Sequence, residues 1–404
     1  MTMMTDRPLA LSAGRPALPA SGENFGLEEH DRRHWIITAG IHMVYRMGVL
    51  GLVGRMADRF VLSRPARGGF GFRKKSAPCF TILTYHRVHP THSLFGIDTV
   101  TPALFESQMR CVRRQFTVLT VEEIVYRIRA GHPLPPRCAA ITFDDGYADN
   151  YHHAYPILKR LGLRATFFLA TGCIGSGQVL WFDRVLRAFE QTRCTEAVLP
   201  YAGEPMPLST MEQRQVAGFL ALRWLRATPG DEREAAMRQL FECLQVIPPA
   251  KDPVLMLDWD QVRAMARDGF RFGAHTVSHP ILTTISLDEV ATEVRDSKQA
   301  IEEATGQPVT TFAYPSGRPQ DYSSEIVSLL SSAGYTAAVT SGAFAVNSTG
   351  EDLFRLKRMR PWERDIASFF LRLVWVKWFD SGQRSTPAEP VAMAPSRIES
   401  RASC

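Results

Sequence analysis

The chain has 404 residues, of which 45% are hydrophobic and 22% charged, a composition typical of a globular protein with one large domain and additions, or with two domains. Its net charge of +6 is unevenly distributed. Residues 31–75 contain ten basic and two acidic residues, so this segment carries +8 and the remainder −2. This distribution argues against a nucleic-acid-binding body. The seven cysteines are scattered and form no CxxC, which argues against a disulfide framework or a cysteine metal site and favours a reducing compartment.

The N-terminal 75 residues differ from the rest of the chain. Residues 1–30 are rich in Pro, Ala and Ser and lack the apolar core of a secretory signal, so we expect a disordered tail. Residues 31–75 form a basic, amphipathic flank that ends in a Gly- and Arg-rich linker. Its apolar run at 35–53 is nearly long enough to span a bilayer, but Arg46 inside it costs ~2.5–3.5 kcal/mol on insertion.

Three interpretations of this apolar run remain: a membrane span, an interfacial helix with its arginines on anionic headgroups, and a helix packed on the body. We expect peripheral membrane contact through the 31–75 flank. The body would then be cytoplasmic, held on the inner face of the cytoplasmic membrane.

Residues 76–365 alternate between predicted strands and helices. Strands are predicted at 80–86, 139–143, 165–170, 270–272, 309–314, 336–340 and 354–360. Helices are predicted at 104–116, 121–130, 151–161, 259–267, 287–304 and 323–333. This alternation predicts an α/β fold with a mostly parallel sheet, closed or nearly closed into a barrel. A further amphipathic helix is predicted at 366–380, and a Pro/Ser/Ala-rich disordered tail at 381–404.

A helical insertion interrupts the alternation at 173–257, because loops in α/β units are normally much shorter. Its helices are predicted at 183–191, 211–227 and 231–244. It follows the carboxyl end of a strand, beside the mouth of the barrel. It is therefore either a cap that shapes the substrate site or a helical pair with no role in that site. Trp181 at its entry could stack on a sugar or belong to the core.

Two adjacent carboxylates, Asp144 and Asp145, follow the apolar strand at 139–143 and precede Gly146. Neighbouring strand residues point to opposite faces, so the two side chains should have different roles unless the glycine bends the chain. Like charges this close raise one another's pKa unless a cation lies between them. The pair is either a metal ligand beside a general base or a helix N-cap pair.

His275 and His279, four residues apart, follow the predicted strand at 270–272. This spacing places both imidazoles on one side of a helical turn, where they can bind one metal. The alternative is two solvated loop histidines. With an aspartate from another strand end, the pair supplies three ligands and leaves coordination positions open for water and substrate, as a catalytic site requires.

The motifs TFDDG and HTxxHP, in this order, resemble the polysaccharide deacetylase family, the NodB-homology group of carbohydrate esterases, over residues 80–361. The resemblance implies a distorted (β/α) barrel and metal-dependent removal of N-acetyl groups from a sugar polymer, oligosaccharide or lipid-linked glycan. It assigns Asp144 as the base and Asp145, His275 and His279 as ligands of one divalent ion, Zn²⁺ first and Co²⁺ or Ni²⁺ as alternatives. The competing functions are a hydrolase of another non-peptide C–N bond and a non-catalytic sugar-binding barrel.

Two family motifs are altered in this chain. The segment FAYPSG at 312–317 stands where the family usually has an Arg-rich motif, so the resemblance implies that the Tyr314 amide helps form the oxyanion hole, next to Pro315 and Arg318. A basic partner for Asp144 must then come from elsewhere. Its candidates are Arg318, Arg355 and Arg358.

The second alteration is that no histidine follows His279, although many family members have a late histidine as general acid. This resembles the permuted branch of the family, which includes the biofilm poly-N-acetylglucosamine deacetylases and takes the acid from the first strand. Only His86 closes a predicted strand here, so the resemblance implies His86 as the acid. The alternative is a buried histidine bonded to the backbone.

Overall fold

The computed structural model describes residues 78–91, 99–341, 346–361, 363 and 365–379. The tail, flank and membrane contact predicted for residues 1–75, and the tail predicted for 381–404, lie outside these residues. Among the helices of the described part, none combines the length and the apolarity needed to cross a membrane.

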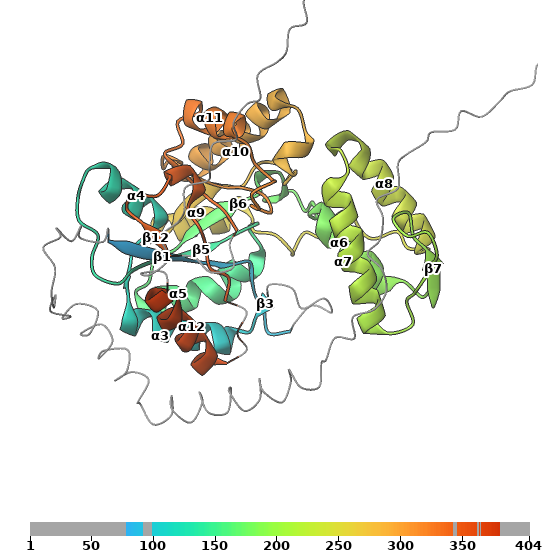
Figure 1. The fold of residues 1–404 in the computed structure, drawn as a ribbon, viewed down its shortest axis with the longest axis horizontal. Helices are drawn as coiled ribbons and strands as arrows, with labels where there is room; N and C mark the ends of the chain where they lie inside the picture. The colour runs from blue at the N-terminus through green and yellow to red at the C-terminus, as the bar shows by residue number, and fades with distance from the viewer. Residues whose placement is uncertain (1–77, 92–98, 342–345, 362, 364, 380–404) are drawn as a thin grey trace, which may run out of the picture. The chain divides into compact units, whose positions relative to one another are not determined.

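A curled, mostly parallel sheet forms the body, as predicted (Figure 1). Its strands run in the order β11, β10, β9, β6, β5, β1 and β12, and β4 also pairs with β5. Their bounds are β1 (Cys79–Tyr85), β4 (Thr117–Val118), β5 (Cys138–Phe143), β6 (Thr166–Leu169), β9 (Arg271–Ala274), β10 (Thr311–Ala313), β11 (Ala337–Val339) and β12 (Asn347–Ser348). All pairs are parallel except β12 with β1. β5 is buried at every position, because parallel sheets are covered on both faces.

The segment 356–359 connects β11 at one side of the sheet with β1 at the other. The Leu356 amide donates to Ala338 O of β11 (3.0 Å), and the Met359 amide donates to Ile82 O of β1 (2.8 Å). The prediction of a continuous strand at 354–360 was therefore wrong. A 3-10 turn at Leu353–Arg355 is followed by isolated bridges, because this short stretch passes from one strand to another instead of following either.

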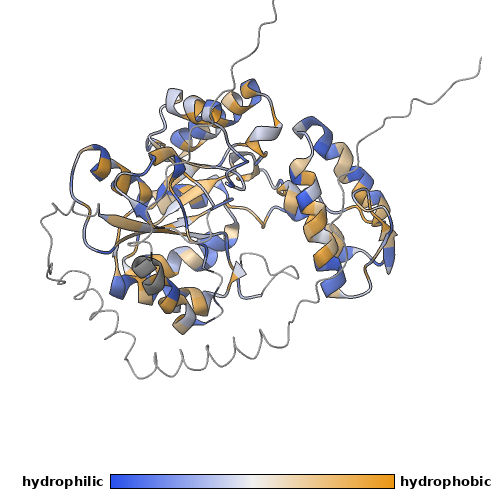
Figure 2. Ribbon diagram, in the orientation of Figure 1, coloured by the Kyte–Doolittle hydropathy of each residue, from blue (hydrophilic) through white to orange (hydrophobic). Residues whose placement is uncertain are grey.

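Helices cover the outside of the sheet, and Figure 2 shows their mixed hydropathy beside the apolar strands. Their bounds are α3 (Pro102–Gln115), α4 (Val121–Arg129), α5 (Tyr155–Leu161), α9 (Trp259–Arg267), α10 (Leu287–Thr305), α11 (Ser324–Ser332) and α12 (Ile366–Phe379). Shorter pieces are β2 (Arg87–Val88), which pairs with β3 (Thr99–Val100), and the helical turns Asn150–Ala154, Thr171–Cys173 and Leu282–Thr284. Capping boxes start α4 at Thr120 and α10 at Ser286, which satisfies their first amides.

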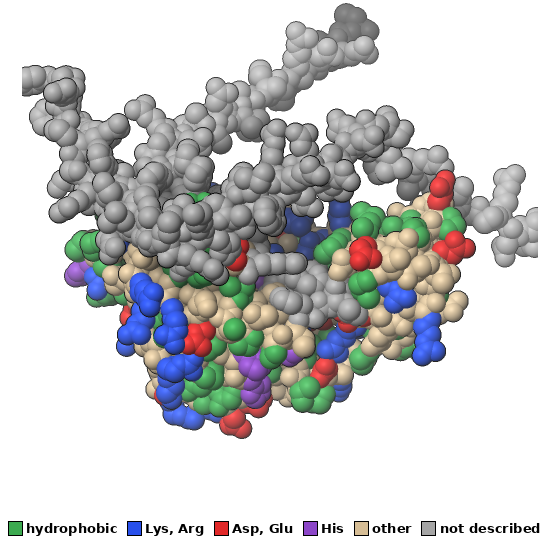
Figure 3. All heavy atoms as spheres, turned by 90° about the horizontal axis from the view of Figure 1, so that it is seen from below, with side chains coloured by type: hydrophobic (Ala, Val, Ile, Leu, Met, Phe, Trp, Pro, Cys, Tyr) green, Lys and Arg blue, Asp and Glu red, His purple; other side chains and the backbone are tan. Residues whose placement is uncertain are grey.

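The insertion is a small helical unit with its own core. It contains α6 (Trp181–Gln191), α7 (Met211–Ala227), α8 (Gly230–Cys243) and the hairpin of β7 (Glu196–Val198) and β8 (Pro205–Pro207). Buried side chains from all three helices, among them Phe189, Leu225 and Leu240, form one cluster. On the face seen in Figure 3, acidic and basic side chains are interspersed with apolar ones.

Candidate active site and metal centre

The turn after β5 separates the two adjacent aspartates. The Asp144 amide still donates to Tyr85 O of β1 (3.0 Å), so Asp144 continues the strand. The chain then bends, with φ of +73° at Asp145 and +89° at Gly146. This φ favours glycine at position 146, where a Cβ would also lie 2.7 Å from the end of the Ile174 side chain. The two carboxylates consequently reach different partners, although their residues are neighbours.

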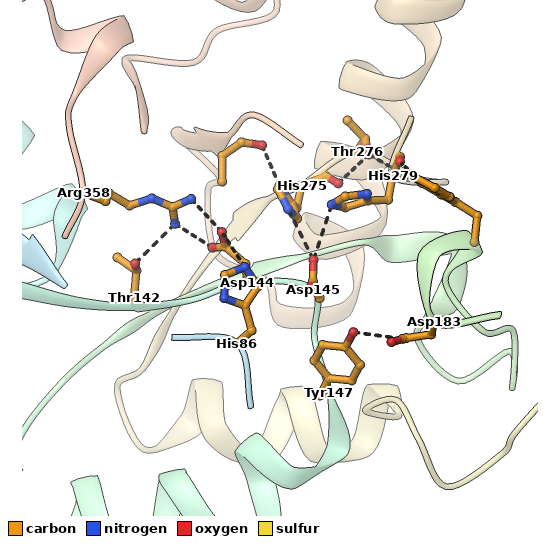
Figure 4. A network of polar contacts seen from close by, with 12 residues as sticks. His86, Thr142, Asp144, Asp145, Tyr147, Asp183, His275, Thr276, His279 and Arg358 are labelled. Atoms are coloured by element: carbon orange, nitrogen blue, oxygen red, sulfur yellow. Dashed lines mark hydrogen bonds and ion pairs between the residues drawn. The ribbon is translucent and has the colours of Figure 1, made fainter. Parts of the chain in front are cut away.

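Asp145, His275 and His279 come together at the carboxyl ends of β5 and β9 (Figure 4). Asp145 Oδ1 lies 3.5 Å from Nε2 of each histidine, and all three side chains are buried. Ligand atoms about 2.1 Å from one ion at tetrahedral angles would lie about 3.4 Å apart. Asp145 Oδ1 also has no hydrogen-bond partner among the described residues. Buried polar atoms rarely lack a partner, so this trio fits a divalent cation.

Both imidazoles can present a lone pair to such a cation. His275 Nδ1 lies 2.7 Å from Ala313 O, which can only accept; the ring proton therefore sits on Nδ1 and Nε2 faces Asp145. Burial lowers the pKa of His279 to about 3 and keeps its ring neutral. Burial alone would raise the pKa of Asp145, but the two neighbouring histidines lower it overall.

Asp144 is paired with Arg358, which the segment 356–359 carries into the barrel. Arg358 Nη1 donates to Oδ1 (2.7 Å) and Nη2 to Oδ2 (2.6 Å). Arg358 also donates to Thr340 O through Nε (3.1 Å). Burial raises the pKa of Asp144, but the guanidinium outweighs it and holds this pKa below its ordinary value. Asp144 is therefore an ionised carboxylate in a fixed orientation.

The structure distinguishes among the three arginine candidates. Arg355 lies at the surface, 3.3 Å from Asp352, and Arg318 is exposed. Only Arg358 of the three reaches Asp144. His86 follows β1 directly and lies on the solvent side of Asp144: its Nε2 is 3.9 Å from Asp144 Oδ2, and its side chain is 17% exposed against 3% for the aspartate.

The expected oxyanion role of the Tyr314 amide is not supported. That amide donates to Val339 O (3.2 Å) and so belongs to the sheet, while the phenol donates to Phe354 O (3.0 Å). Pro315 beside it is buried and has no N–H. Trp181 is partly buried, and its Nε1 donates to His279 O (3.0 Å). Its indole is thus engaged with a metal-site residue, and a sugar-stacking role remains a prediction.

Sequence reasoning missed a polar group beside the metal site. The Tyr147 hydroxyl donates to Asp183 of the insertion (2.9 Å), and the Arg87 guanidinium lies 4.6 Å from the Tyr147 ring centroid while Nε donates to Asp149 (2.7 Å). Burial raises the pKa of Asp183 to about 7. Tyr147 and Asp149 stand directly after the DDG motif, and this proximity was the available signal.

Comparisons with known proteins identify the family of this chain. The profile of the polysaccharide deacetylase family matches residues 131–338. YxkH of Bacillus subtilis (strain 168), named as a polysaccharide deacetylase, is 24% identical over 280 residues, covering 69% of this chain and 70% of YxkH. A poly-beta-1,6-N-acetyl-D-glucosamine N-deacetylase of Staphylococcus aureus (strain MSSA476) is 33% identical over 106 residues, 23% of this chain and 36% of that protein.

Among solved structures, the Streptococcus pyogenes deacetylase PplD in complex with acetate has a similar fold, with a TM-score of 0.51 and 21% sequence identity over 74% of this chain and 99% of PplD. The family match spans more than half of the chain, and both family motifs lie within it. The chain belongs to the polysaccharide deacetylase family of NodB homology, hydrolases that act on the amide bonds of N-acetylated sugars.

Proposed function

We propose that this enzyme is a metal-dependent N-deacetylase of an N-acetylated glycan, with Asp145, His275 and His279 as the metal ligands and Asp144 as the base. The observation that carries the proposal is the geometry of the DDG turn. One aspartate faces two imidazoles, and its neighbour is fixed by a buried arginine. One carboxylate with two imidazoles suits Zn²⁺, and Co²⁺ and Ni²⁺ are alternatives.

A cation bound by this trio would lower the pKa of its water and polarise the acetamide carbonyl. Two residues of the chain, Asp144 and His86, carry out the two proton transfers. Asp144, kept ionised by Arg358, accepts the proton of the attacking water. His86, at the solvent side of Asp144, donates a proton to the nitrogen of the leaving sugar amine. Since the Tyr314 amide is engaged in the sheet, the oxyanion needs another donor.

The substrate that we propose first is a β-1,6-linked N-acetylglucosamine polymer. The support is the Staphylococcus aureus relative, whose name gives that substrate, although the match covers 36% of its length. Oligosaccharides and lipid-linked glycans carry the same acetamide group and are the alternatives.

The test is acetate release from a panel of N-acetylated glycans, measured on protein loaded with Zn²⁺, Co²⁺ or Ni²⁺. We expect release from at least one polymer of N-acetylglucosamine, and none from the Asp144→Asn variant, which keeps the ligand set. Absence of acetate from every glycan with every metal would contradict the proposed activity. Wild-type metal content in a His275→Ala/His279→Ala variant would contradict the ligand assignment.

A further inference from the structure

The two histidines of the metal centre are oriented in different ways. His275 has a hydrogen bond from Nδ1 to Ala313 O (2.7 Å), the usual means by which a metal-ligating imidazole is fixed. His279 Nδ1 is buried and has no hydrogen-bond partner among the described residues. The orientation of the His279 ring must therefore come from packing and from its backbone.

The backbone of His279 has an uncommon conformation. Its φ is +57°, in the left-handed region that non-glycine residues rarely adopt, and Pro280 follows it, which normally favours extended backbone. Such conformations persist where the surroundings over-determine them. Two hydrogen bonds do so here: the His279 amide donates to Thr276 Oγ1 (3.0 Å), and its carbonyl accepts from Trp181 Nε1 (3.0 Å).

The insertion supplies contacts to both the backbone and the ring of His279. Trp181 and Phe182 are the first two residues of α6. Trp181 donates to the carbonyl, and the centroid of the Phe182 ring lies 5.1 Å from that of the His279 imidazole, with the two planes at 65°. The next residue, Asp183, accepts from Tyr147 beside the other motif (2.9 Å). The first turn of α6 thus contacts both motif loops.

Trp181 is itself held by the rest of the insertion. The guanidinium of Arg233, a buried residue of α8, lies 5.1 Å from the indole centroid, and its Nη2 donates to Thr284 Oγ1 (2.9 Å). The start of α8 also lies against this loop, because a Cβ at Gly230 would come within 2.4 Å of Ile285 Cγ2. The insertion therefore holds the loop 279–285 at both of its ends.

We propose that the helical insertion is a positioning element of the metal centre, in which Trp181 and Phe182 hold His279 in its ligating orientation. The proposal rests on the ligand set of the proposed function. It gives the insertion a role in metal affinity that does not depend on the identity of the glycan. Trp181 acts through His279 and is a positioning residue.

The test is metal affinity, measured by competition with a chelator, together with the absorption spectrum of the Co²⁺-loaded full-length protein. Trp181→Phe removes the indole N–H but keeps an aromatic ring. We expect it to raise the Zn²⁺ dissociation constant about tenfold, the lower range for loss of a partner outside the ligand set, and to change the Co²⁺ bands. The matched control is Trp224→Phe, since Trp224 packs on Tyr201 against the insertion core, with 5.8 Å between the ring centroids. It should leave both readouts unchanged.

Wild-type affinity and an unchanged Co²⁺ spectrum in Trp181→Phe would overturn the proposal. Equal weakening in Trp181→Phe and Trp224→Phe would also overturn it, because the effect would then be general to the insertion. If Trp181→Phe does not fold, Phe182→Leu replaces it with the same expected and contrary results. Because these readouts need no glycan, a protein that shows them but releases no acetate contradicts the proposed activity alone. Wild-type metal content in His279→Ala would remove the ligand assignment and the positioning proposal with it.

Discussion

Arg358 and Asp144 form a two-pronged ion pair inside the barrel, with N–O distances of 2.7 and 2.6 Å. The two residues are 214 positions apart in the chain, and the side chains of both are at most 3% exposed. The planar fork of an arginine fixes the plane of a carboxylate as well as its charge. The pair therefore links closure of the barrel through residues 356–359 to the orientation of the base.

The Arg358→Leu variant should lose both stability and activity. Removal of one partner of a buried pair leaves an uncompensated charge, which costs about 3–5 kcal/mol in the free energy of unfolding. Denaturant unfolding measures this loss, and the double variant Asp144→Asn/Arg358→Leu should recover part of it. Arg355→Leu is the matched control, because Arg355 is a surface residue of the turn just before this segment, and it should change stability by less than about 0.5 kcal/mol. Equal effects of the two leucine variants would show that the pair has no special role.

The Asp144→Asn variant should lose turnover while its metal content stays at the wild-type level. The substitution removes a proton acceptor, whereas Asp145→Asn removes a charged ligand of the cation. Metal analysis and acetate release, measured on the same preparations of both variants, separate these roles. Loss of metal from Asp144→Asn with retention in Asp145→Asn would mean that the roles of the two aspartates are reversed.

His86→Ala should lower kcat/KM by about 10²–10⁴, the usual contribution of a general acid. It should also abolish the basic limb of the pH–rate profile, because that limb reports loss of the acid's proton, and it should leave metal content unchanged. His89→Ala is the control: His89 belongs to the same stretch, but its Nδ1 contacts Thr91 O (2.9 Å) and not Asp144. A near-normal rate with an intact basic limb in His86→Ala would assign the acid role to another group.

The sequence predicted the parts of this site that depend on local pattern. Helices α7 and α9 begin and end at the predicted residues, since their apolar positions lie within the helices and their capping residues flank them directly. A site of one aspartate and two histidines was predicted because each motif follows a recognisable apolar strand, and parallel strands bring their carboxyl ends to one edge. The choice of Asp145 over Asp144 as the ligand came from the family resemblance.

Features that depend on distant contacts were not predictable in this way. Arg318, Arg355 and Arg358 are chemically equivalent in the sequence, and only the path of the segment 356–359 distinguishes them. For Tyr314, residue type does not show whether the amide is already bonded to a neighbouring strand, as it is to Val339. The contact of Trp181 with His279 likewise joins two segments 98 residues apart.

Asp183 should make the stability of the metal-free protein depend on pH. Burial raises its pKa from 3.8 to about 7, while Tyr147 donates to it and Arg87, Arg187 and Asp145 act on it by charge. Between these two pKa values the folded protein binds a proton that the unfolded chain has released. The contribution of Asp183 to the free energy of unfolding is therefore fully present below about pH 4 and is lost as the pH rises through about 7.

Thermal unfolding from pH 4 to 8, with metal removed by a chelator, tests this dependence. The melting temperature of the wild type relative to Asp183→Asn should fall over that range, because asparagine accepts the Tyr147 hydrogen bond but does not titrate. Glu234→Gln is the control, since Glu234 is an exposed carboxylate of the insertion paired with Arg184. A constant difference between the wild type and Asp183→Asn would show that Asp183 does not carry this proton.

The 31–75 flank should bind the protein reversibly to anionic membranes. Its +8 charge lies beside the apolar run at 35–53, a combination that favours an interfacial helix over a span, because Arg46 opposes insertion. Each basic residue near an anionic surface contributes about 1 kcal/mol, and this attraction weakens as salt screens it. In liposome sedimentation, the full-length chain should pellet with anionic vesicles at low salt, less at high salt and little with neutral vesicles. A truncation that starts at Ser76 should stay in the supernatant throughout. If the full-length chain sediments no more than the truncation, the flank does not bind membranes; sedimentation that salt does not reduce would instead indicate a membrane span.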